Sequence, residues 1–321
     1  MDRLDPIDAR LLDEFQRDLP LVPQPFAALG AALGLDEAEV IDRLARLKAT
    51  GAIARVGATV RPNTAGASTL AAVAAPEGRV DEVAAIIGAE PGVNHSYLRE
   101  DNWNLWFVAT APDAAGLDQS LARIEAQTGL RVLDLRLVRA FNIDLGFRLT
   151  GERQPMAQDA GAASIALTDD DRKLLSHLSR GLSLVPRPFA ALGADEAATL
   201  SRLKALLQAR VITRLGVIVR HRTLGWTSNA MVVWDLPEAA IPVAGAALAA
   251  LPGVTLCYQR RSVPGVWPYA LYSMIHGRSR AEALAVLDRA RALPALAGAK
   301  AKPLFSTRCF KQTGALLSEA A

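Results

Sequence analysis

Residues 91–100, PGVNHSYLRE, contain three side chains that could act together on a ligand. The Pro-Gly pair is typical of a turn, and the residues after it predict a strand. Successive side chains of a strand point to opposite faces, so His95, Tyr97 and Arg99 would share one face. A histidine exchanges protons near neutral pH, and a guanidinium binds anions such as carboxylates. Three such side chains on one strand face would be a costly way to build a core, so the spacing indicates a functional site.

The segments that would position these residues occur twice in the chain. LVPQPFAALG at 21–30 returns as LVPRPFAALG at 184–193, with one difference in ten positions. Two further segments repeat in the same order: GAIARVGATVRPNTAG (51–66) as RVITRLGVIVRHRTLG (210–225), and PGVNHSY (91–97) as PGVTLCY (252–258). We interpret this as a tandem duplication of a unit of about 160 residues, which would form an internal pseudo-dimer with an approximate two-fold axis.

Each half begins with a helical pattern. In the first half, residues 4–18, 23–34 and 36–51 have the apolar spacing and end signals of three helices. Residues 53–60 then alternate as a short hairpin would, which predicts a wing. The same order of signals runs from 167 to 220 in the second half. The pattern predicts a winged helix-turn-helix at the start of each half.

The remainder of each half changes to a mixed pattern. In the first half it predicts strands at 68–76, 93–100, 104–111 and 131–141 and helices at 80–90 and 114–129. This βαββαβ order is that of a ferredoxin-like domain, whose open sheet face a second copy can cover. The predicted fold class is α+β. The predicted domains are a winged helix-turn-helix at 1–62, a ferredoxin-like domain at 63–150, a linker at 151–166, a winged helix-turn-helix at 167–222 and a ferredoxin-like domain at 223–321.

The composition of the chain limits the classes of function. Of 321 residues, 51% are hydrophobic and 21% charged, which is typical of a folded protein with several cores. The absence of a signal-peptide pattern and of a membrane-spanning apolar segment predicts a cytoplasmic protein without membrane contact. The two cysteines, Cys257 and Cys309, have no metal-type spacing, so no metal site is expected. The formal net charge of +3 suits an anionic ligand and is weak for a nucleic-acid binder.

A winged helix-turn-helix followed by a ferredoxin-like domain resembles the Lrp/AsnC transcription regulators, and residues 4–18 resemble that family's first helix. The charges argue against DNA binding. The third helix begins with Asp36 and Glu37, and its repeat begins with Asp195 and Glu196, where a reading helix would approach phosphates. These carboxylates also favour the helix dipole. The second copy is four residues shorter before this helix, so the two modules would not read a palindromic site equally.

Longer motifs match one branch of this architecture. They are HSYLRE-x-x-WNLWF (95–107) in the first half, and CYQRR (257–261), VWPYALYSMIHGRS (266–279) and STRCFKQTG (306–314) in the second. These motifs resemble the siroheme decarboxylases, with a D-type first half and an L-type second half. The chain is similar to the fused form found in denitrifiers, and the resemblance extends over essentially the whole chain.

The resemblance implies a carbon-carbon lyase that acts on siroheme. Such an enzyme converts two acetate side chains to methyl groups and gives 12,18-didecarboxysiroheme, on the route to d-type haem. Loss of carbon dioxide leaves carbanion character on a methylene carbon, so a positioned general acid is required. Protonation of the pyrrole ring can supply the electron sink, and no added cofactor is needed. The implied partners are siroheme and its product, together with related decarboxylase subunits or a second copy of the chain.

Binding the many carboxylates of a flat tetrapyrrole calls for arginines on an apolar surface. The repeats align Arg55 with Arg214 and Arg99 with Arg260, although any one arginine could be an ordinary surface charge. Arg99 and Arg260 are favoured because each would share a strand face with a tyrosine. The predicted substrate-binding residues are Arg55, Arg99, Arg214, Tyr258, Arg260 and Trp106.

The predicted catalytic residues are His95, Tyr97 and His276. His95 aligns with Leu256 and His276 aligns with Thr110, so each half would bring one histidine from a different place. Other roles stay open at this point: either histidine could be an axial ligand to the siroheme iron, and His276 could simply end a strand. The alternative function is an Lrp/AsnC-like DNA-binding regulator that senses a small ligand.

Overall fold

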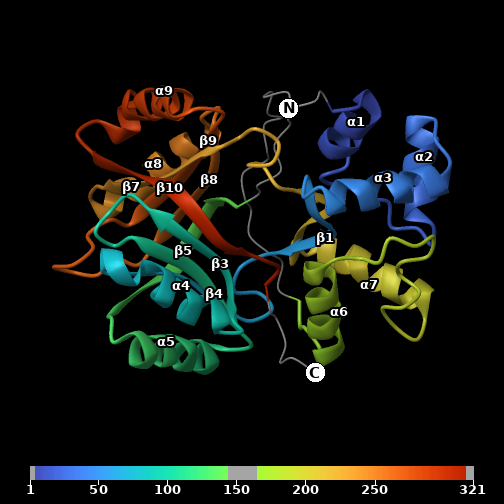
Figure 1. The fold of residues 1–321 in the computed structure, drawn as a ribbon, viewed down its shortest axis with the longest axis horizontal. Helices are drawn as coiled ribbons and strands as arrows, with labels where there is room; N and C mark the ends of the chain where they lie inside the picture. Colours follow the sequence, from blue (N-terminus) through green and yellow to red (C-terminus); the bar gives the residue numbers. More distant parts are fainter. Residues whose placement is uncertain (1–3, 144–164, 316–321) are drawn as a thin grey trace. The chain divides into compact units, whose positions relative to one another are not determined.

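The computed structural model describes residues 4–143 and 165–315. These residues form two compact units that do not follow the order of the halves. The first unit contains residues 4–65 and 165–224, and the second contains residues 66–143 and 225–315. The helical part of both halves thus lies in one unit, and the sheet part of both halves in the other (Figure 1). The predicted domain boundaries stay predictions, and most of the linker predicted at 151–166 lies outside the described residues.

The first unit contains three helices and one strand from the first half: α1 (Pro6–Glu14), α2 (Pro25–Leu33), α3 (Glu37–Ala49) and β1 (Ile53–Val60). Local signals set the helix ends. The carboxylate of Asp5 accepts hydrogen bonds from the first turn of α1, and Asp36 does the same for α3. Gly34 ends α2 with a φ of 74°, a left-handed conformation that glycine adopts without a Cβ clash.

The second half contributes α6 (Asp169–Arg180), α7 (Glu196–Gln208) and β6 (Ile212–Val219). The second of the three helices predicted for this half is wrong, because the described residues at 184–194 form turns. The four-residue shortening is the physical reason. In the first half Ala31–Leu33 complete a second turn of α2, whereas here Gly193 is followed almost at once by Asp195, which caps α7.

The predicted wing hairpin is also not formed within a half. Instead β1 pairs with β6 in antiparallel register, so each half supplies one strand of a two-stranded sheet. Gly57 pairs with Gly216, its equivalent in the repeat, at the centre of this sheet. A Cβ at Gly57 would lie 2.3 Å from the Leu178 carbonyl oxygen, and one at Gly216 would lie 2.5 Å from the Phe15 carbonyl oxygen. The close approach on both sides gives the pairing the two-fold pseudosymmetry expected of an internal pseudo-dimer.

The second unit confirms the predicted βαββαβ order in both halves. The first half forms β2 (Ala67–Val73), α4 (Val80–Ala89), β3 (Val93–Arg99), β4 (Leu105–Ala111), α5 (Ala114–Thr128) and β5 (Val132–Asn142). The second half forms β7 (Ser228–Asp235), α8 (Ile241–Ala250), β8 (Val254–Arg260), β9 (Leu271–Gly277), α9 (Arg280–Arg291) and β10 (Lys300–Gln312). Short 3₁₀ turns precede α4 and α8 and follow α9.

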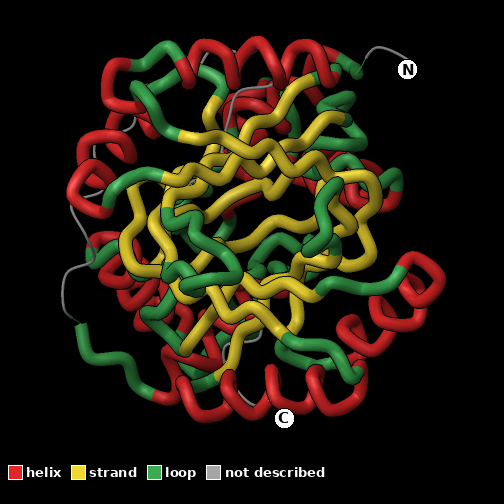
Figure 2. Tube along the Cα trace, turned by 90° about the vertical axis from the view of Figure 1, so that its left-hand side faces the viewer, coloured by secondary structure: helices red, strands yellow, loops and turns green. Residues whose placement is uncertain are grey.

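The two sheets join at both edges into a closed barrel with the strand order β10-β3-β4-β2-β5-β8-β9-β7. The first part of β5 pairs with β2 and its last part with β8, and β10 divides in the same way between β7 and β3. Figure 2 shows the strands as a ring with helices around the outside. The sheet faces therefore cover one another, as the pseudo-dimer predicts, and the edges are joined as well.

Alternation along the strands gives the barrel an inner and an outer set of side chains. The outer sets pack against the helices, with Phe107 and Val93 in one cluster and Trp234 and Ile275 in the other. The inner set contains residues of both halves, including Trp106, Tyr258, Trp267, Tyr272 and Met274. In the ranges 4–143 and 165–315, none of the helices combines the length and apolar character needed to cross a bilayer.

Candidate functional site in the barrel

The face of β3 that carries His95, Tyr97 and Arg99 lies inside the barrel, as the alternation predicts. The intervening Leu98 packs against the outer cluster instead. The rings of His95 and Tyr97 stack with centroids 6.4 Å apart, and the Arg99 guanidinium carbon lies 5.5 Å from the Tyr97 ring centroid. The structure thus brings these three predicted residues together.

The equivalent strand β8 repeats the arrangement with one change. The Arg260 guanidinium carbon lies 4.5 Å from the Tyr258 ring centroid, and the Tyr258 ring stacks on Tyr272 with centroids 6.0 Å apart. Leu256 pairs with Met274 at the place where His95 pairs with Val108. The second half therefore keeps the aromatic ring and the guanidinium but lacks the histidine.

Both arginines reach across a seam between the halves. Arg99 donates from Nη1 to the Leu304 carbonyl oxygen on β10 at 3.0 Å, and Arg260 donates from Nη1 to the Leu135 carbonyl oxygen on β5 at 2.9 Å. Within the described part of the chain, neither guanidinium pairs with a carboxylate. Burial lowers the pKa of Arg99 to about 10, although the phenols of Tyr97 and Tyr258 act in the opposite direction. Two guanidinium groups without a carboxylate partner in residues 4–143 and 165–315 thus lie beside aromatic rings inside the barrel.

His276 also points into the barrel, and both of its ring nitrogens are hydrogen-bonded. Nε2 lies 2.8 Å from the Asn229 side-chain nitrogen, and Nδ1 lies 2.8 Å from the Thr255 hydroxyl. Asn229 in turn accepts from Arg99 Nη1 at 3.3 Å. Burial, with a smaller contribution from the Arg99 charge, lowers the pKa of His276 to about 4. The imidazole is therefore neutral at pH 7, which does not favour the predicted role as proton donor.

His95 has a different environment from that of His276. Its Nδ1 lies 2.6 Å from the Asn94 side-chain oxygen, which can only accept, so Nδ1 carries the proton of the neutral ring. Nε2 is then the nitrogen that gains and releases a proton. The side chain of His95 is half-buried, whereas that of His276 is buried. This geometry suits the predicted role of His95 as a general acid.

Aromatic side chains occupy the inside of the barrel next to the arginines. Trp106 and Trp267 contact each other with ring centroids 5.3 Å apart, and Trp267 donates from Nε1 to the Tyr272 hydroxyl at 2.7 Å. Burial raises the pKa of that hydroxyl. Trp106 was predicted to belong to the site, whereas Tyr272 was not. Tyr272 lies two residues before Met274 on strand β9, so the alternation of the strand places both side chains on the inner face. This signal could have been found in the sequence.

Asn229 and Thr255 are further residues that sequence reasoning missed. Asn229 is the polar member of an alternating set whose other members, Met231 and Val233, are buried inside the barrel. Thr255 lies at a β-bulge, between the paired residues Val254 and Leu256. The sequence alone indicates that Asn229 points inward, but it does not show that both residues contact His276.

Arg55 and Arg214 lie in the first unit, on β1 and β6. Arg55 faces Ile218 across the two-stranded sheet, and Arg214 faces Thr59. Arg55 donates to the Ala58 carbonyl oxygen at 3.3 Å, and burial lowers its pKa. The predicted site residues are therefore divided between the units, and the substrate-binding role of these two arginines stays a prediction.

A groove of about 800 Å³ also lies in the first unit, between the loop at Leu21 and the start of α7. Its charged side chains are of both signs, with Asp195 and Glu196 beside Arg187 and Lys204. It is lined by none of the predicted site residues. The convergence of arginine, histidine and aromatic rings makes the barrel interior the better candidate.

Two protein-family models match the chain. The AsnC-like ligand binding domain matches residues 65–142 and 223–311, which together form more than half of the sequence. The Siroheme decarboxylase NirDL-like HTH domain matches residues 8–53. These matches fall on the sheet part of both halves and on the helical part of the first half.

Similar proteins match the chain over its length or over one half. The Siroheme decarboxylase NirDL subunit of Paracoccus denitrificans is 64% identical over 322 residues, covering 99% of each chain. The Siroheme decarboxylase NirD subunit of Stutzerimonas stutzeri is 49% identical over 146 residues, covering 46% of this chain and 96% of that subunit. A crystal structure of the siroheme decarboxylase NirDL in complex with an iron-uroporphyrin III analogue superposes with a TM-score of 0.68 at 27% identity, covering 98% of this chain and 94% of that one.

Proposed function

We propose that this chain, which belongs to the siroheme decarboxylase family, removes carboxyl groups from siroheme. In detail, two acetate side chains would become methyl groups, giving didecarboxysiroheme as a precursor of d-type haem. The reaction is that of a carbon-carbon lyase, and the proposal includes no dissociable cofactor. The observation that carries the proposal is a pair of arginines inside the barrel, the buried Arg99 and the partly exposed Arg260, neither of which has a carboxylate partner among the described residues.

Arg99 and Arg260 can bind substrate carboxylates because neither guanidinium forms an ion pair with a carboxylate of the described residues. A buried guanidinium without a counter-ion is costly, and a substrate carboxylate would remove that cost. The flat aromatic rings of Tyr97 and Tyr258 lie against the same guanidinium groups and suit the face of a macrocycle. Charge and shape together favour an anionic, aromatic ligand over an amino acid.

The chemistry requires one proton for each carboxyl group lost. The carbon-carbon bond to the carboxylate breaks, carbon dioxide leaves, and the electron pair stays on the methylene carbon until a proton converts it to a methyl group. His95 is the best-placed donor, since Asn94 fixes the proton of the neutral ring on Nδ1 and leaves Nε2 as the exchanging nitrogen. Tyr97, stacked on the same ring, would orient it.

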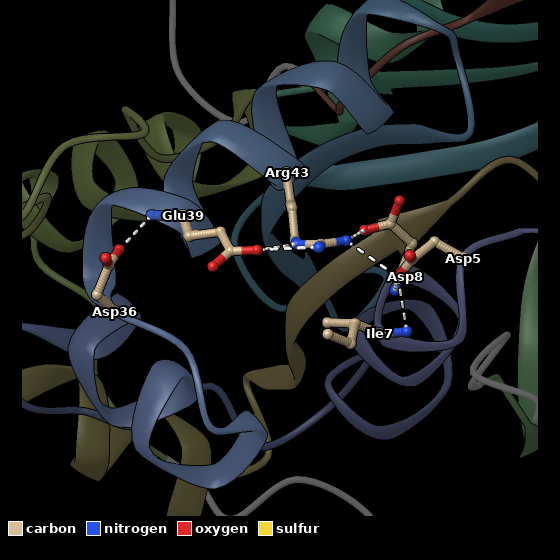
Figure 3. Close-up of polar contacts among 6 residues, drawn as sticks. All are labelled: Asp5, Ile7, Asp8, Asp36, Glu39 and Arg43. Atoms are coloured by element: carbon tan, nitrogen blue, oxygen red, sulfur yellow. Dashed lines mark hydrogen bonds and ion pairs between the residues drawn. The ribbon is translucent and has the colours of Figure 1, made fainter.

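The helical unit offers little support for the alternative of a DNA-binding regulator. Arg43 on α3 is engaged by acidic residues, with Nη1 2.9 Å from Asp8 and 3.0 Å from Asp5, and Nη2 2.9 Å from Glu39 (Figure 3). The equivalent arginine of α7, Arg202, is paired with Asp171. These two equivalent arginines are thus paired with carboxylates inside the unit, which supports the proposal that DNA binding is absent.

Anaerobic incubation of the purified chain with siroheme, followed by mass analysis of the extracted tetrapyrrole, tests the proposed activity. We expect the loss of two carbon dioxide units from siroheme. The double variant Arg99→Ala, Arg260→Ala should leave siroheme unchanged and serves as the control for spontaneous decarboxylation. Unchanged siroheme with the wild-type chain would contradict the proposal, after addition of the related subunits has been tested. A DNA mobility assay would then test the regulator.

A further inference from the structure

Four polar side chains inside the barrel form a connected series that ends at Arg99. Arg99 Nη1 donates to Asn229 Oδ1 at 3.3 Å, and the Asn229 amide nitrogen lies 2.8 Å from His276 Nε2. His276 Nδ1 lies 2.8 Å from the Thr255 hydroxyl, which donates to the Met274 carbonyl oxygen at 3.1 Å. Arg99 and His276 are 6% and 9% exposed, so the series is shielded from water.

The chemistry of the groups fixes the direction of every bond. A guanidinium only donates, so Asn229 must present its oxygen to Arg99 and its NH₂ group to His276. Nε2 of His276 is then an acceptor without a proton, and the proton of the neutral ring is on Nδ1. The Thr255 hydroxyl oxygen accepts the hydrogen bond from Nδ1–H, because its own hydrogen is directed at the Met274 carbonyl oxygen. One arrangement of donors and acceptors satisfies the whole series.

We infer that His276 is a positioning residue, which holds Arg99 through Asn229 in the orientation that binds a substrate carboxylate. If Nε2 were protonated, Asn229 would have to rotate and direct its NH₂ group at the guanidinium, which would break the bond to Arg99. The neutral histidine therefore fixes the orientation of the Asn229 amide; this arrangement of His276 and Asn229 is called the lock below. This inference rests on the proposed function for the identity of the carboxylate, but the bonding of His276 can be tested without it.

The equivalent position near Arg260 lacks this lock. By the repeat, Asn229 corresponds to Ser68 and His276 to Thr110, which pair with each other on β2 and β4 as Asn229 and His276 pair on β7 and β9. A hydroxymethyl group is too short to replace the amide. The Arg260 guanidinium has one hydrogen bond within the described residues, to the Leu135 carbonyl oxygen. The inference is therefore specific to the Arg99 side of the barrel.

Steady-state kinetics separates a positioning role from proton donation. His276→Leu and Asn229→Ala should each raise the KM for siroheme by about tenfold with kcat changed less than about threefold. His276→Gln offers an amide oxygen to Asn229 and should restore most of the affinity. Loss of kcat by about a hundredfold or more in both histidine variants would overturn the inference, because a proton donor would be missing in each. Ser68→Ala is the matched control and should leave both parameters unchanged.

Nitrogen NMR of the ¹⁵N-histidine-labelled chain tests the lock without any turnover. At pH 7 the resonances assigned to His276 by their loss in His276→Gln should be those of a neutral ring protonated on Nδ1. In Asn229→Ala the Nε2 resonance should shift while the spectrum of the other histidines is kept, which also reports an intact fold. A ring protonated on Nε2, or a charged ring, would overturn the inference. If wild-type chain does not decarboxylate siroheme but gives the expected spectrum, the proposed function fails and the lock stands.

Discussion

The two halves of the barrel place the same pair of side chains in unequal surroundings. Arg99 is almost fully buried and is held by a carbonyl oxygen and by Asn229, whereas Arg260 is partly exposed and is held by a carbonyl oxygen. The guanidinium of Arg260 instead lies closer to its tyrosine ring. Duplication thus kept the arginine and tyrosine that we propose to bind an anion and changed the residues around them.

The histidines differ in the same way. The Nδ1 atom of each histidine contacts a residue at the β-bulge near the start of the second strand of its βαββαβ region, Asn94 on β3 or its repeat equivalent Thr255 on β8. In the first half the histidine is the next residue on the same strand, and in the second it lies on the neighbouring strand. The same β-bulge therefore holds the two histidines for which we propose different roles, proton exchange for His95 and orientation for His276.

The largest effect that this comparison predicts is on turnover. His95→Ala should lower kcat for siroheme decarboxylation by about 10²- to 10⁴-fold, the usual contribution of a general acid, while siroheme binding is kept. Single-turnover measurements with bound siroheme would separate these parameters. Leu256→Ala, at the equivalent position, is the control and should keep turnover within about threefold. Unchanged turnover in His95→Ala would remove this histidine from the mechanism.

The second prediction concerns the pH dependence of stability. His276 has its pKa lowered to about 4, so the unfolded chain takes up this proton near pH 6.5 and the folded chain near pH 4. As the pH is lowered from 6.5 to 4, the free energy of unfolding of the wild-type chain should therefore decrease by up to about 3 kcal/mol more than that of His276→Gln. Urea unfolding between pH 4 and pH 7 gives the comparison. Parallel curves for the two proteins would show that the histidine is not held neutral by Arg99 and its buried site.

The third prediction compares the two arginines directly. Arg99→Ala should raise the KM for siroheme by about tenfold to a hundredfold, because it also removes the donor to Asn229 Oδ1 and to the Leu304 carbonyl oxygen. Arg260→Ala should raise the KM less. The Arg260 guanidinium has one hydrogen bond to the protein, so the ligand must order it on binding. Equal effects in spectroscopic titrations with siroheme would mean that the two halves bind equivalently.

The smallest effect is expected in the helical unit. Arg202→Ala should destabilise the fold by about 2 kcal/mol, because it leaves the buried Asp171 carboxylate, whose pKa is lowered to about 2, without its cation. Arg43→Ala should cost about 1 kcal/mol or less, since two of its carboxylate partners are well exposed to water. Chemical unfolding of both variants measures the difference, and a larger loss for Arg43→Ala would reverse the comparison.

Much of this arrangement could be predicted from the sequence, and the limits have physical causes. Repeats and alternation gave the βαββαβ order and the shared face of His95, Tyr97 and Arg99, because these are local properties of the chain. The alternation at 53–60 predicts a hairpin, but it does not reveal whether the partner strand is near in the sequence or, as β6 is, far away. The contacts of His276 join residues on three strands, and their spacing in the sequence has no pattern that predicts them.

The division of β5 and β10 between two sheets has a consequence for fragments of the chain. Each half ends in a strand whose last residues, 137–142 or 306–312, complete the sheet of the other half. A half expressed alone would expose this segment and the unpaired edge of β3 or β8, which are templates for association. Each isolated half should therefore be found bound to its complement or to a second copy of itself, and mixing the two halves should exchange those partners.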